Sequence, residues 1–210
     1  MKKKLSGLFL CIMLLASTGL FAQSTYYEKG NTSFSFTAGI TAPFFLHFWT
    51  GENNHPDQWY FFSNDMNIYV GGYAAISYMA FTNERWAFGG ELGYSFNYDK
   101  GDHLYYNVPL MAKVAYYPIQ TGKFDLYLTA GLGLAYNHYT SNNLTDVSQG
   151  LLSPYANLGI GGMYFFNDNW GLGLETGVDF IPQISFYQDT AQDNGTFATI
   201  PVVLKVTYRN

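Results

Sequence analysis

Apolar and polar residues alternate along this chain with a period of two. In the segment WAFGGELGYSFNY (86–98), the even-numbered positions are mostly aromatic or aliphatic, and the odd-numbered positions hold Ala, Gly, Glu, Ser and Asn. Successive side chains of a β-strand point to opposite faces, so this pattern predicts a strand with one apolar face and one small, polar face. Glu91 lies on the polar face.

The pattern recurs often enough to predict a complete sheet. Eight segments alternate in this way, and we expect each to form a strand: 31–42, 68–81, 86–98, 104–117, 124–139, 152–166, 170–181 and 196–208. The chain is therefore expected to be all-β, with an even number of strands.

Short and long connections alternate between these strands. The connections at one end are short: 82–85, 118–123 and 167–169. Those at the other end are mostly long: 45–66, 99–103, 140–151 and 182–195. Outer-membrane barrels have short periplasmic turns and longer external loops. The connections therefore favour an eight-stranded antiparallel up-and-down transmembrane β-barrel.

An internal repeat supports a closed sheet. Two pairs of segments match along the chain: NERWAFGGELG with NDNWGLGLETG, and VPLMAKVAY with IPVVLKVTY. The alignment places Trp86 with Trp170, Glu91 with Glu175, and Lys113 with Lys205. We interpret the match as two copies of one hairpin in a roughly two-fold barrel.

The two faces of the strands indicate which side is inside. The polar face carries several charges and cannot form an apolar core, because unpaired buried charges are costly. The opposite face is nearly free of charge and would promote aggregation if it met water. Lipid around a closed barrel satisfies both requirements, since the barrel pairs its own backbone groups. Glu91 is therefore expected to point into the lumen.

The lumen is expected to hold ion pairs. Antiparallel pairing across the 99–103 connection predicts a pair between Glu91 and Lys113, and the repeat predicts a second between Glu175 and Lys205. Asp125 is expected to lie close enough to join the first pair. Five tyrosines are expected to fill the remaining space: Tyr69, Tyr73, Tyr105, Tyr127 and Tyr155. An eight-stranded interior is mostly filled by side chains, so we interpret the pairs as structural. The alternative is a gate that opens when a pair separates.

Aromatic residues gather at the strand ends of the apolar face. An interfacial girdle is expected near the short turns, formed by Trp86, Tyr116, Phe124, Tyr164, Phe166, Trp170 and Tyr208. A second girdle near the long connections is expected from Tyr98, Tyr106 and Tyr136. The alternative is the aromatic core of a soluble sheet, which would not need aromatics at the strand ends.

The chain resembles the small eight-stranded outer-membrane β-barrels of the OmpA/OmpX type. The resemblance rests on the strand starts at Trp86 and Trp170 and on the final IPVVLKVTYRN, and it covers nearly all of the chain after the leader. It implies an outer-membrane location, with outer-membrane lipid and the barrel-assembly machinery as partners. Such barrels usually end on an aromatic residue, whereas Tyr208 is followed here by Arg209 and Asn210. Because an aromatic last residue resembles the signal by which the assembly machinery recognises such barrels, the Arg209–Asn210 ending bears on how this chain is recognised for insertion.

The first 22 residues resemble an export signal. Lys2, Lys3 and Lys4 precede an apolar stretch that ends near Ala22, so we expect a signal peptide over 1–22 and a single barrel domain over 23–210. An uncleaved anchor helix is the alternative. The chain's one cysteine, Cys11, falls within this leader, so disulfides cannot stabilise the exported domain.

Composition and charge exclude several functions. The chain is 20% aromatic and only 12% charged, with a net charge of −5, and no basic run follows the leader, so nucleic acid is not expected as a partner. The four histidines are His47, His55, His103 and His138. None lies in a pattern that predicts a nucleophile, a base and an orienting acid together. We therefore expect no enzymatic activity, no cofactor and no metal site, although His55 and Asp57 share a loop.

Specific function is expected in the connections at the long-loop end. Segment 45–66 carries seven aromatics, and we single out five as candidate surface contacts: Phe48, Trp49, Trp59, Tyr60 and Phe61. We expect an integral outer-membrane barrel with a structural or surface-interaction role, which contacts an extracellular ligand or host surface. The alternatives are a narrow pore gated by the lumenal pairs, a lipid-modifying barrel enzyme that uses His138, and a soluble periplasmic barrel.

Overall fold

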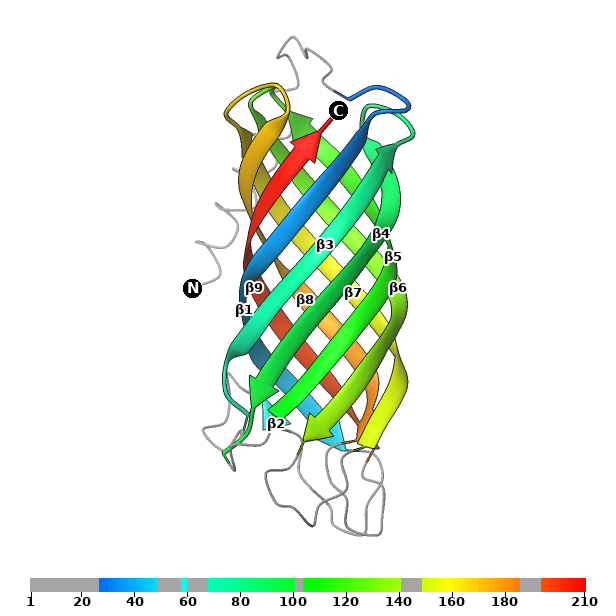
Figure 1. The fold of residues 1–210 in the computed structure, drawn as a ribbon, viewed down its shortest axis with the longest axis vertical. Coiled ribbons are helices and arrows are strands. Elements are labelled where there is room, and N and C mark those ends of the chain that lie inside the picture. The colour runs from blue at the N-terminus through cyan, green and yellow to red at the C-terminus, as the bar shows by residue number, and fades with distance from the viewer. Residues whose placement is uncertain (1–26, 49–57, 60–67, 101–103, 141–148, 186–193) are drawn as a thin grey trace, which may run out of the picture.

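The computed structural model describes residues 27–48, 58–59, 68–100, 104–140, 149–185 and 194–210. Its strands are β1 (Thr32–Phe48), β2 (Gln58–Trp59), β3 (Gly71–Phe81), β4 (Trp86–Tyr98), β5 (Leu104–Gln120), β6 (Phe124–Thr140), β7 (Gln149–Phe165), β8 (Trp170–Ser185) and β9 (Asn194–Arg209). Each long strand pairs antiparallel with its neighbours, and β1 pairs with β9 to close the sheet. The fold is a closed, all-antiparallel β-barrel of eight long strands, confirming the predicted class (Figure 1).

The strand bounds largely follow the alternation in the sequence. The prediction for β4 matches its observed bounds, whereas β1, β5 and β8 run several residues further than predicted, to Phe48, Gln120 and Ser185. The short strand β2 lies within the segment predicted as the first long connection and pairs with Phe45 and Leu46 of β1. No helix in the described part of the chain is long and apolar enough to cross a bilayer.

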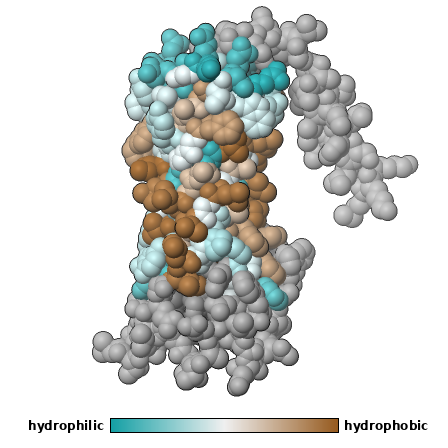
Figure 2. All heavy atoms as spheres, turned by 90° about the vertical axis from the view of Figure 1, so that its right-hand side faces the viewer, coloured by the Kyte–Doolittle hydropathy of each residue, from teal (hydrophilic) through white to brown (hydrophobic). Residues whose placement is uncertain are grey.

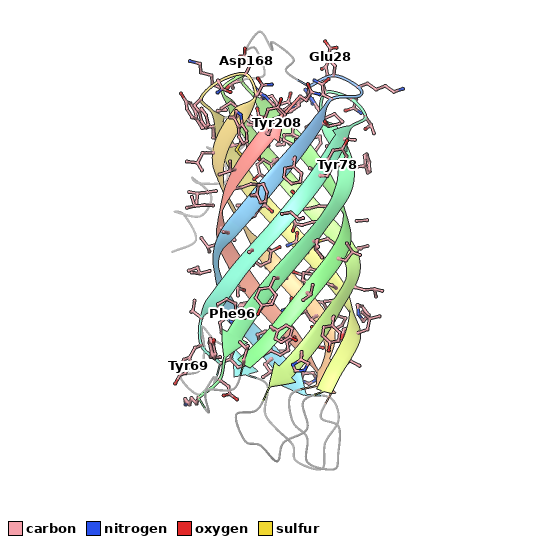
Figure 3. All side chains as sticks on the ribbon, in the orientation of Figure 1. Glu28, Tyr69, Tyr78, Phe96, Asp168 and Tyr208 are labelled. Atoms are coloured by element: carbon pink, nitrogen blue, oxygen red, sulfur yellow. The ribbon has the colours of Figure 1, made fainter. Side chains whose placement is uncertain are left out.

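The apolar residues of the strands face outward. Leu132, for example, is 71% exposed on β6, whereas its strand neighbour Gly131 is buried. Side chains radiate from the barrel wall along its whole length (Figure 3). On the face shown in Figure 2, hydrophobic residues gather over the middle of the barrel, and hydrophilic residues gather at the short-turn end. The lumenal face is lined mainly by serine, threonine, asparagine, tyrosine and charged residues.

Two short turns repeat the same local structure. Asn83 Oδ1 accepts hydrogen bonds from the backbone N–H groups of Arg85 and Trp86, at 2.8 and 2.9 Å. Asn167 Oδ1 does the same for Asn169 and Trp170, at 3.0 and 2.7 Å. An asparagine that caps its own turn explains why NERW and NDNW each reverse the chain just before a strand begins with tryptophan.

One predicted lumenal residue faces the other way. Tyr69 is 51% exposed, whereas its neighbour Ile68 is buried. The alternation predicted the opposite for both residues. The regular strand starts only at Gly71, and the preceding residues are held by an isolated bridge between Ile68 and Asp99. Without a continuous pleat, the parity of β3 does not extend back to Tyr69, so the prediction for this residue was wrong.

Candidate functional site

Four charged residues form one network across the lumen. Lys113 Nζ on β5 lies 2.7 Å from Glu91 Oε2 on β4 and 3.1 Å from Glu175 Oε1 on β8. Lys205 Nζ on β9 lies 2.8 Å from Glu175 Oε2. The sequence predicted two separate pairs, but the structure joins them through Lys113. The network therefore connects the hairpin β4–β5 to the hairpin β8–β9.

The two hairpins place their lysines in the same register. Lys113 is directly across from Gly89, and Lys205 is directly across from Gly173. A Cβ added at Gly89 would collide with the carbonyl oxygen of Tyr78 on the adjacent strand. A larger residue at Gly89 would therefore force β4, which carries Glu91, away from β3. The sequence repeat is thus also a repeat of strand pairing.

Two tyrosines complete the hydrogen bonding of the carboxylates. The Tyr73 hydroxyl donates to Glu91 Oε1 at 2.9 Å, and the Tyr127 hydroxyl donates to Glu175 Oε2 at 3.1 Å. Lys205 Nζ also lies 5.0 Å from the centroid of the Tyr127 ring. Buried charges persist only when they are paired and hydrogen-bonded, and this network meets both conditions.

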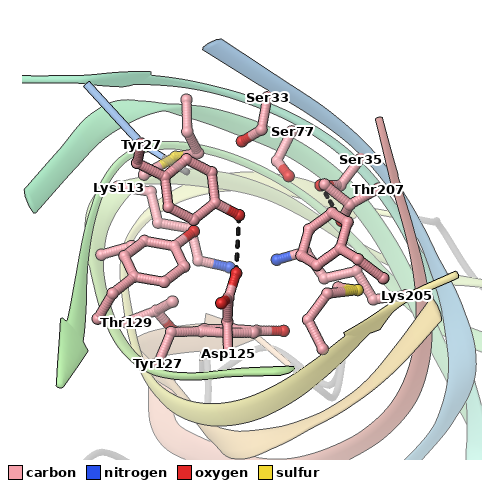
Figure 4. Close-up of a pocket in the computed structure, with 15 residues that line it drawn as sticks. Tyr27, Ser33, Ser35, Ser77, Lys113, Asp125, Tyr127, Thr129, Lys205 and Thr207 are labelled. Atoms are coloured by element: carbon pink, nitrogen blue, oxygen red, sulfur yellow. Dashed lines mark hydrogen bonds between the residues drawn. The ribbon is translucent and has the colours of Figure 1, made fainter. Parts of the chain in front are cut away.

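Asp125 has different partners from those predicted. It lies near the short-turn end, where the Tyr27 hydroxyl donates to its Oδ2 at 2.9 Å (Figure 4). Arg209 Nη1 lies 3.7 Å from the same oxygen. No contact between Asp125 and Glu91 or Lys113 is present among the described residues. Strand β6 begins at Phe124, so Asp125 is the second residue of the strand and lies nearer to the short-turn end than the charged network does.

Arg209 binds the turns at this end of the barrel. Its Nε donates to the carbonyl of Asp168 at 2.8 Å, and its Nη2 donates to the carbonyl of Gly122 at 3.2 Å. Its guanidinium lies 3.5 Å from the centroid of the Phe165 ring. The residue that departs from the usual aromatic ending of such barrels is therefore buried, with its side chain inside the lumen.

Tyr27 helps to close the same end of the barrel. It precedes β1, whereas Arg209 is the last residue of β9, the strand that pairs with β1. Its ring stacks on Phe81 at 3.9 Å between centroids and packs against Tyr117. Burial raises the pKa of the Tyr27 phenol well above its usual value, and the nearby Asp125 carboxylate adds to this effect. The phenol therefore stays protonated and donates its hydrogen bond. Neither Tyr27 nor Arg209 was predicted as a site residue, although the inward parity of Lys205 and Thr207 extends to Arg209.

The lumenal cavities that the described residues enclose around the charged network are small. The cavity between the network and the Tyr27–Asp125 contact has a volume of about 20 Å³, and a second beside Glu91 and Glu175 has about 10 Å³. A single water molecule needs roughly 10–15 Å³ of this volume. Each cavity is therefore large enough for about one water molecule and too small for a larger solute.

The lumen changes character toward the long-loop end. Asn157 Nδ2 donates to the buried Asp179 carboxylate at 2.6 Å, beyond the charged network. Further toward that end, inward-facing side chains form an apolar cluster, which we call the upper cluster: Leu46, Ile68, Tyr105, Met111, Ala135, Tyr155, Ile181 and Phe197. The tyrosine filling was predicted, but the aliphatic residues were not.

The predicted girdle residues lie on the outside of the barrel at the short-turn end. Trp86 packs on Tyr116 with 4.7 Å between ring centroids, and Trp170 packs on Tyr208 at 5.1 Å. Phe124, Tyr164 and Phe166 are also exposed there. At the long-loop end, Tyr106 stacks on His138 at 5.1 Å. His138 thus lies within the second girdle.

Most candidate surface contacts fall outside the described residues. This holds for Trp49, Tyr60 and Phe61, for His55, Asp57 and His103, and for the predicted leader 1–22. For Phe48 and Trp59 the structure gives the strand positions alone. The part of the chain that the structure describes contains no cluster of three or more residues suited to hold a metal ion.

Solved structures with a similar fold are outer-membrane proteins. Neisserial surface protein A superposes with a TM-score of 0.54 at 14% identity, covering 86% of this chain and 97% of that one. The outer membrane protein OprG from Pseudomonas aeruginosa superposes with a TM-score of 0.50 at 13% identity, covering 90% of this chain and 99% of that one. At such low identity the likeness shows the fold.

Sequence comparisons extend over much of the barrel. An uncharacterized protein of Borreliella burgdorferi is 27% identical over 121 residues, which cover 51% of this chain and 57% of the relative. The match therefore spans little more than half of that protein. A protein-family model matches residues 18–208, a range that includes every strand of the barrel except the last residue of β9.

Proposed function

We propose that this family member, with the fold of outer-membrane β-barrels, is a plugged scaffold that sits in the outer membrane and presents its long connections for surface interaction. The outward apolar belt fits the hydrocarbon of outer-membrane lipid. Insertion in that membrane implies export and contact with the barrel-assembly machinery. An extracellular ligand or host surface is then the expected partner of the long connections.

The network across the lumen is the observation that carries this proposal. Lys113 links Glu91 and Glu175 from opposite walls, and the adjoining cavities measure about 20 and 10 Å³. An ion that followed the lumen would have to separate these buried pairs, which is costly. A filled lumen favours the scaffold over the narrow pore.

Conductance of the refolded chain in a planar bilayer tests the closed lumen. We expect no resolved current steps from protein shown to be folded by its heat-modifiable migration on a gel. Stable steps that change size in Lys113→Met or Glu91→Gln would overturn the scaffold and favour the gated pore.

The surface role has a separate test. Bacteria that display the chain are compared with bacteria that display a Trp49→Ser, Tyr60→Ser, Phe61→Ser variant for attachment to epithelial monolayers. We expect attachment to fall in the variant and to remain in the control Asn142→Ser, Asn143→Ser, which alters a polar connection. Equal attachment by all three chains would exclude the aromatic loop as the contact surface.

A further inference from the structure

The outer wall of the barrel has an apolar groove on β1 and β3. Ala38 and Ala74 lie directly across from each other on these strands and point outward. They form the floor of a groove of about 620 Å³, which we call the hollow. The other outward-facing residues that line the hollow are larger: Phe36, Ile76, Leu92, Tyr94, Val108, Leu204 and Val206.

The sequence repeat places a larger residue at the equivalent position of the second half of the barrel, β6 to β9. Ala74 pairs with Tyr94 of β4. Leu158 pairs with Val178 of β8, and Val178 occupies the same position as Tyr94 after the tryptophan that begins its strand. Leu158 therefore takes the place of Ala74, and its side chain is 66% exposed. A leucine projects from the second half where the first half, β1 to β5, is hollow.

A charged pocket lies at the short-turn end of the same strands. Its volume is about 580 Å³, and Thr82 and Asn83, which follow β3, form part of it. Four exposed charged residues complete its lining: Glu28, Lys29, Glu84 and Arg85. None of the four forms an ion pair with another residue that the structure describes. We call this pocket, at whose end of the barrel Glu28 is labelled in Figure 3, the rim pocket.

The second half keeps only one of these four charges. Its turn NDNW corresponds to NERW, and Gly122 before β6 corresponds to Gly30 before β1, since both glycines have positive φ. In the order of the four charged residues just named, the equivalent residues are Gln120, Thr121, Asp168 and Asn169. The first half therefore combines four charges at the rim with the hollow, and the second half has neither the full set of charges nor the alanine floor.

Two cations and two carboxylates around one pocket complement a zwitterion. Arginine and lysine side chains bind phosphate, and carboxylates accept hydrogen bonds from a primary ammonium group. The girdle residue Trp86 directly follows Arg85, so the rim pocket lies at the level of the lipid headgroups. A phospholipid headgroup that carries one phosphate and one primary ammonium group matches both kinds of charge.

The rim pocket and the hollow are about one lipid length apart. Ile76 is on the side of the hollow nearer to the short turns, and Thr82 lines the rim pocket. The stretch of chain between them is about 20 Å long at roughly 3.3 Å per residue. One leaflet of a bilayer, headgroups included, is also about 20 Å thick. A lipid that lies along the strands, which tilt by about 35–45° in such barrels, therefore reaches from one pocket to the other.

We propose that the outer wall formed by β1, β3 and β4 binds one phospholipid of the leaflet at the short-turn end. Its aminoethyl phosphate headgroup occupies the rim pocket, and one of its acyl chains occupies the hollow. The inference rests on the proposed membrane location and goes beyond the scaffold role, because it assigns a ligand to the outer face. The hollow opens onto the hydrocarbon of the membrane, so an acyl chain enters it without crossing water.

Native mass spectrometry of the folded chain in detergent counts the lipids that stay bound. The probes are phosphatidylethanolamine, phosphatidylcholine and phosphatidylglycerol with identical acyl chains. We expect one phosphatidylethanolamine per chain, bound about fivefold or more tightly than either other lipid. Failure of the chain to insert in vesicles would contradict the membrane location itself. A chain that is folded by its heat-modifiable migration but shows no headgroup preference would overturn the lipid site alone.

Two variants separate the headgroup from the acyl chain. Glu28→Gln, Glu84→Gln removes the partners of the ammonium group and should lower the affinity for phosphatidylethanolamine to that for phosphatidylcholine. Asp168→Asn, which removes a carboxylate from the rim of the second half, is its control and should keep the preference. Ala74→Leu fills the hollow and should weaken the binding of both lipids alike. Ala130→Leu, the same change on the outer face of β6, should weaken neither.

Three results would contradict the proposal. A preference that survives the two glutamate substitutions would remove the carboxylates as its cause. Tighter binding of phosphatidylglycerol would mean that the cations act alone, so the ligand would not be a zwitterion. A dimer that Ala74→Leu abolishes would show that a second copy of the chain covers the hollow in place of an acyl chain.

A measurement in vesicles decides the question if detergent displaces every lipid. Phosphatidylethanolamine and phosphatidylcholine, each with a spin label on one acyl chain, are added in turn to vesicles that contain the folded chain. We expect a larger motionally restricted fraction for phosphatidylethanolamine, and Glu28→Gln, Glu84→Gln should abolish the difference. Equal restricted fractions for the two lipids around the unsubstituted chain would refute the site.

Discussion

Lys113 on β5 reaches Glu175 on β8, with 3.1 Å between Nζ and Oε1, and so joins strands from opposite sides of the barrel. Most pairing in a β-barrel is between neighbouring strands. A contact across the lumen adds a constraint that the sheet alone does not supply. It makes the filled interior a single cross-linked unit, and the stability of the barrel should depend on it.

Reversing the charge at the centre of this network should destabilise the barrel strongly. Lys113→Glu places a third carboxylate beside Glu91 and Glu175 and leaves both without their shared cation. Breaking one buried pair costs about 3–5 kcal/mol, and we expect a loss of at least that size. Urea unfolding in lipid vesicles, followed by tryptophan fluorescence, measures it. Lys113→Glu with the same unfolding midpoint as the unsubstituted chain would refute the pairing.

A double-mutant cycle isolates the contact across the lumen. Lys113→Met, Glu175→Gln and the double variant are unfolded in urea under identical conditions. Because the two side chains touch, the free energies of the single variants should not add, and the coupling should be about 0.5–3 kcal/mol. Lys205→Met with Glu91→Gln is the matched control, because among the described residues Lys205 pairs with Glu175 and Glu91 pairs with Lys113, and no ion pair joins Lys205 to Glu91. Equal coupling in both cycles would argue against a specific contact.

Removing Arg209 should loosen the short-turn end. The side chain holds the carbonyls of Asp168 and Gly122 and lies beside Asp125, and hydrogen bonds to charged groups contribute about 1.5–3 kcal/mol each. In Arg209→Ala we expect faster amide hydrogen exchange in the turns 121–123 and 166–169. Exchange in the turn 82–85, which Arg209 does not bind, serves as the internal reference. Unchanged exchange in all three turns would count against the assigned role.

The Tyr27 phenol should make the barrel sensitive to alkaline pH. Its pKa is raised in the folded chain, so its contribution is complete below the unfolded pKa of about 10 and is lost as pH rises toward the folded pKa. Tyr27→Phe should be less stable at neutral pH and should lose less stability above pH 10 than the unsubstituted chain does. Unfolding midpoints measured from pH 8 to 11 give the comparison. Parallel curves for the two chains would remove Tyr27 as a source of the pH dependence.

The two tryptophans of the repeat should report the same membrane depth. Trp86 and Trp170 begin matching strands and pack on matching tyrosines, so lipids brominated at one depth should quench both alike. Variants in which the other three tryptophans are replaced by phenylalanine allow each to be measured. Quenching at clearly different depths would show that the barrel tilts or that one end of the belt lies outside the hydrocarbon.

Alternation of side chains was enough to predict the faces, the strand number and the connections. A period of two leaves little freedom once a strand such as 86–98 carries Trp, Phe and Leu on one side and Glu91 on the other. The pairing of Glu91 with the segment 111–113 was predicted from the 99–103 connection, and Glu91 lies directly across from Met111. These features depend on residues close together in the chain, so they can be predicted from short stretches of sequence.

The remaining features depend on contacts between distant segments. Tyr27 lies before the first strand and finds Asp125 only after β1 and β9 have closed the sheet, so no local pattern marks it. The contact of Lys113 with Glu175 requires the curvature of the closed barrel. The prediction for Tyr69 failed for a different reason, since a pleat that starts at Gly71 cannot be extended past the residue where regular pairing begins.

The shared register of the two hairpins has a consequence for the history of the chain. The repeat is displaced by four strands, so the barrel consists of two four-stranded halves, β1 to β5 without β2, and β6 to β9. An ancestral half-length chain, with free edges on its first and last strands, could close the same cylinder by pairing with a second copy of itself. Duplication and fusion would then have let one lysine, Lys113, diverge from its counterpart and reach the acidic residue of the other half.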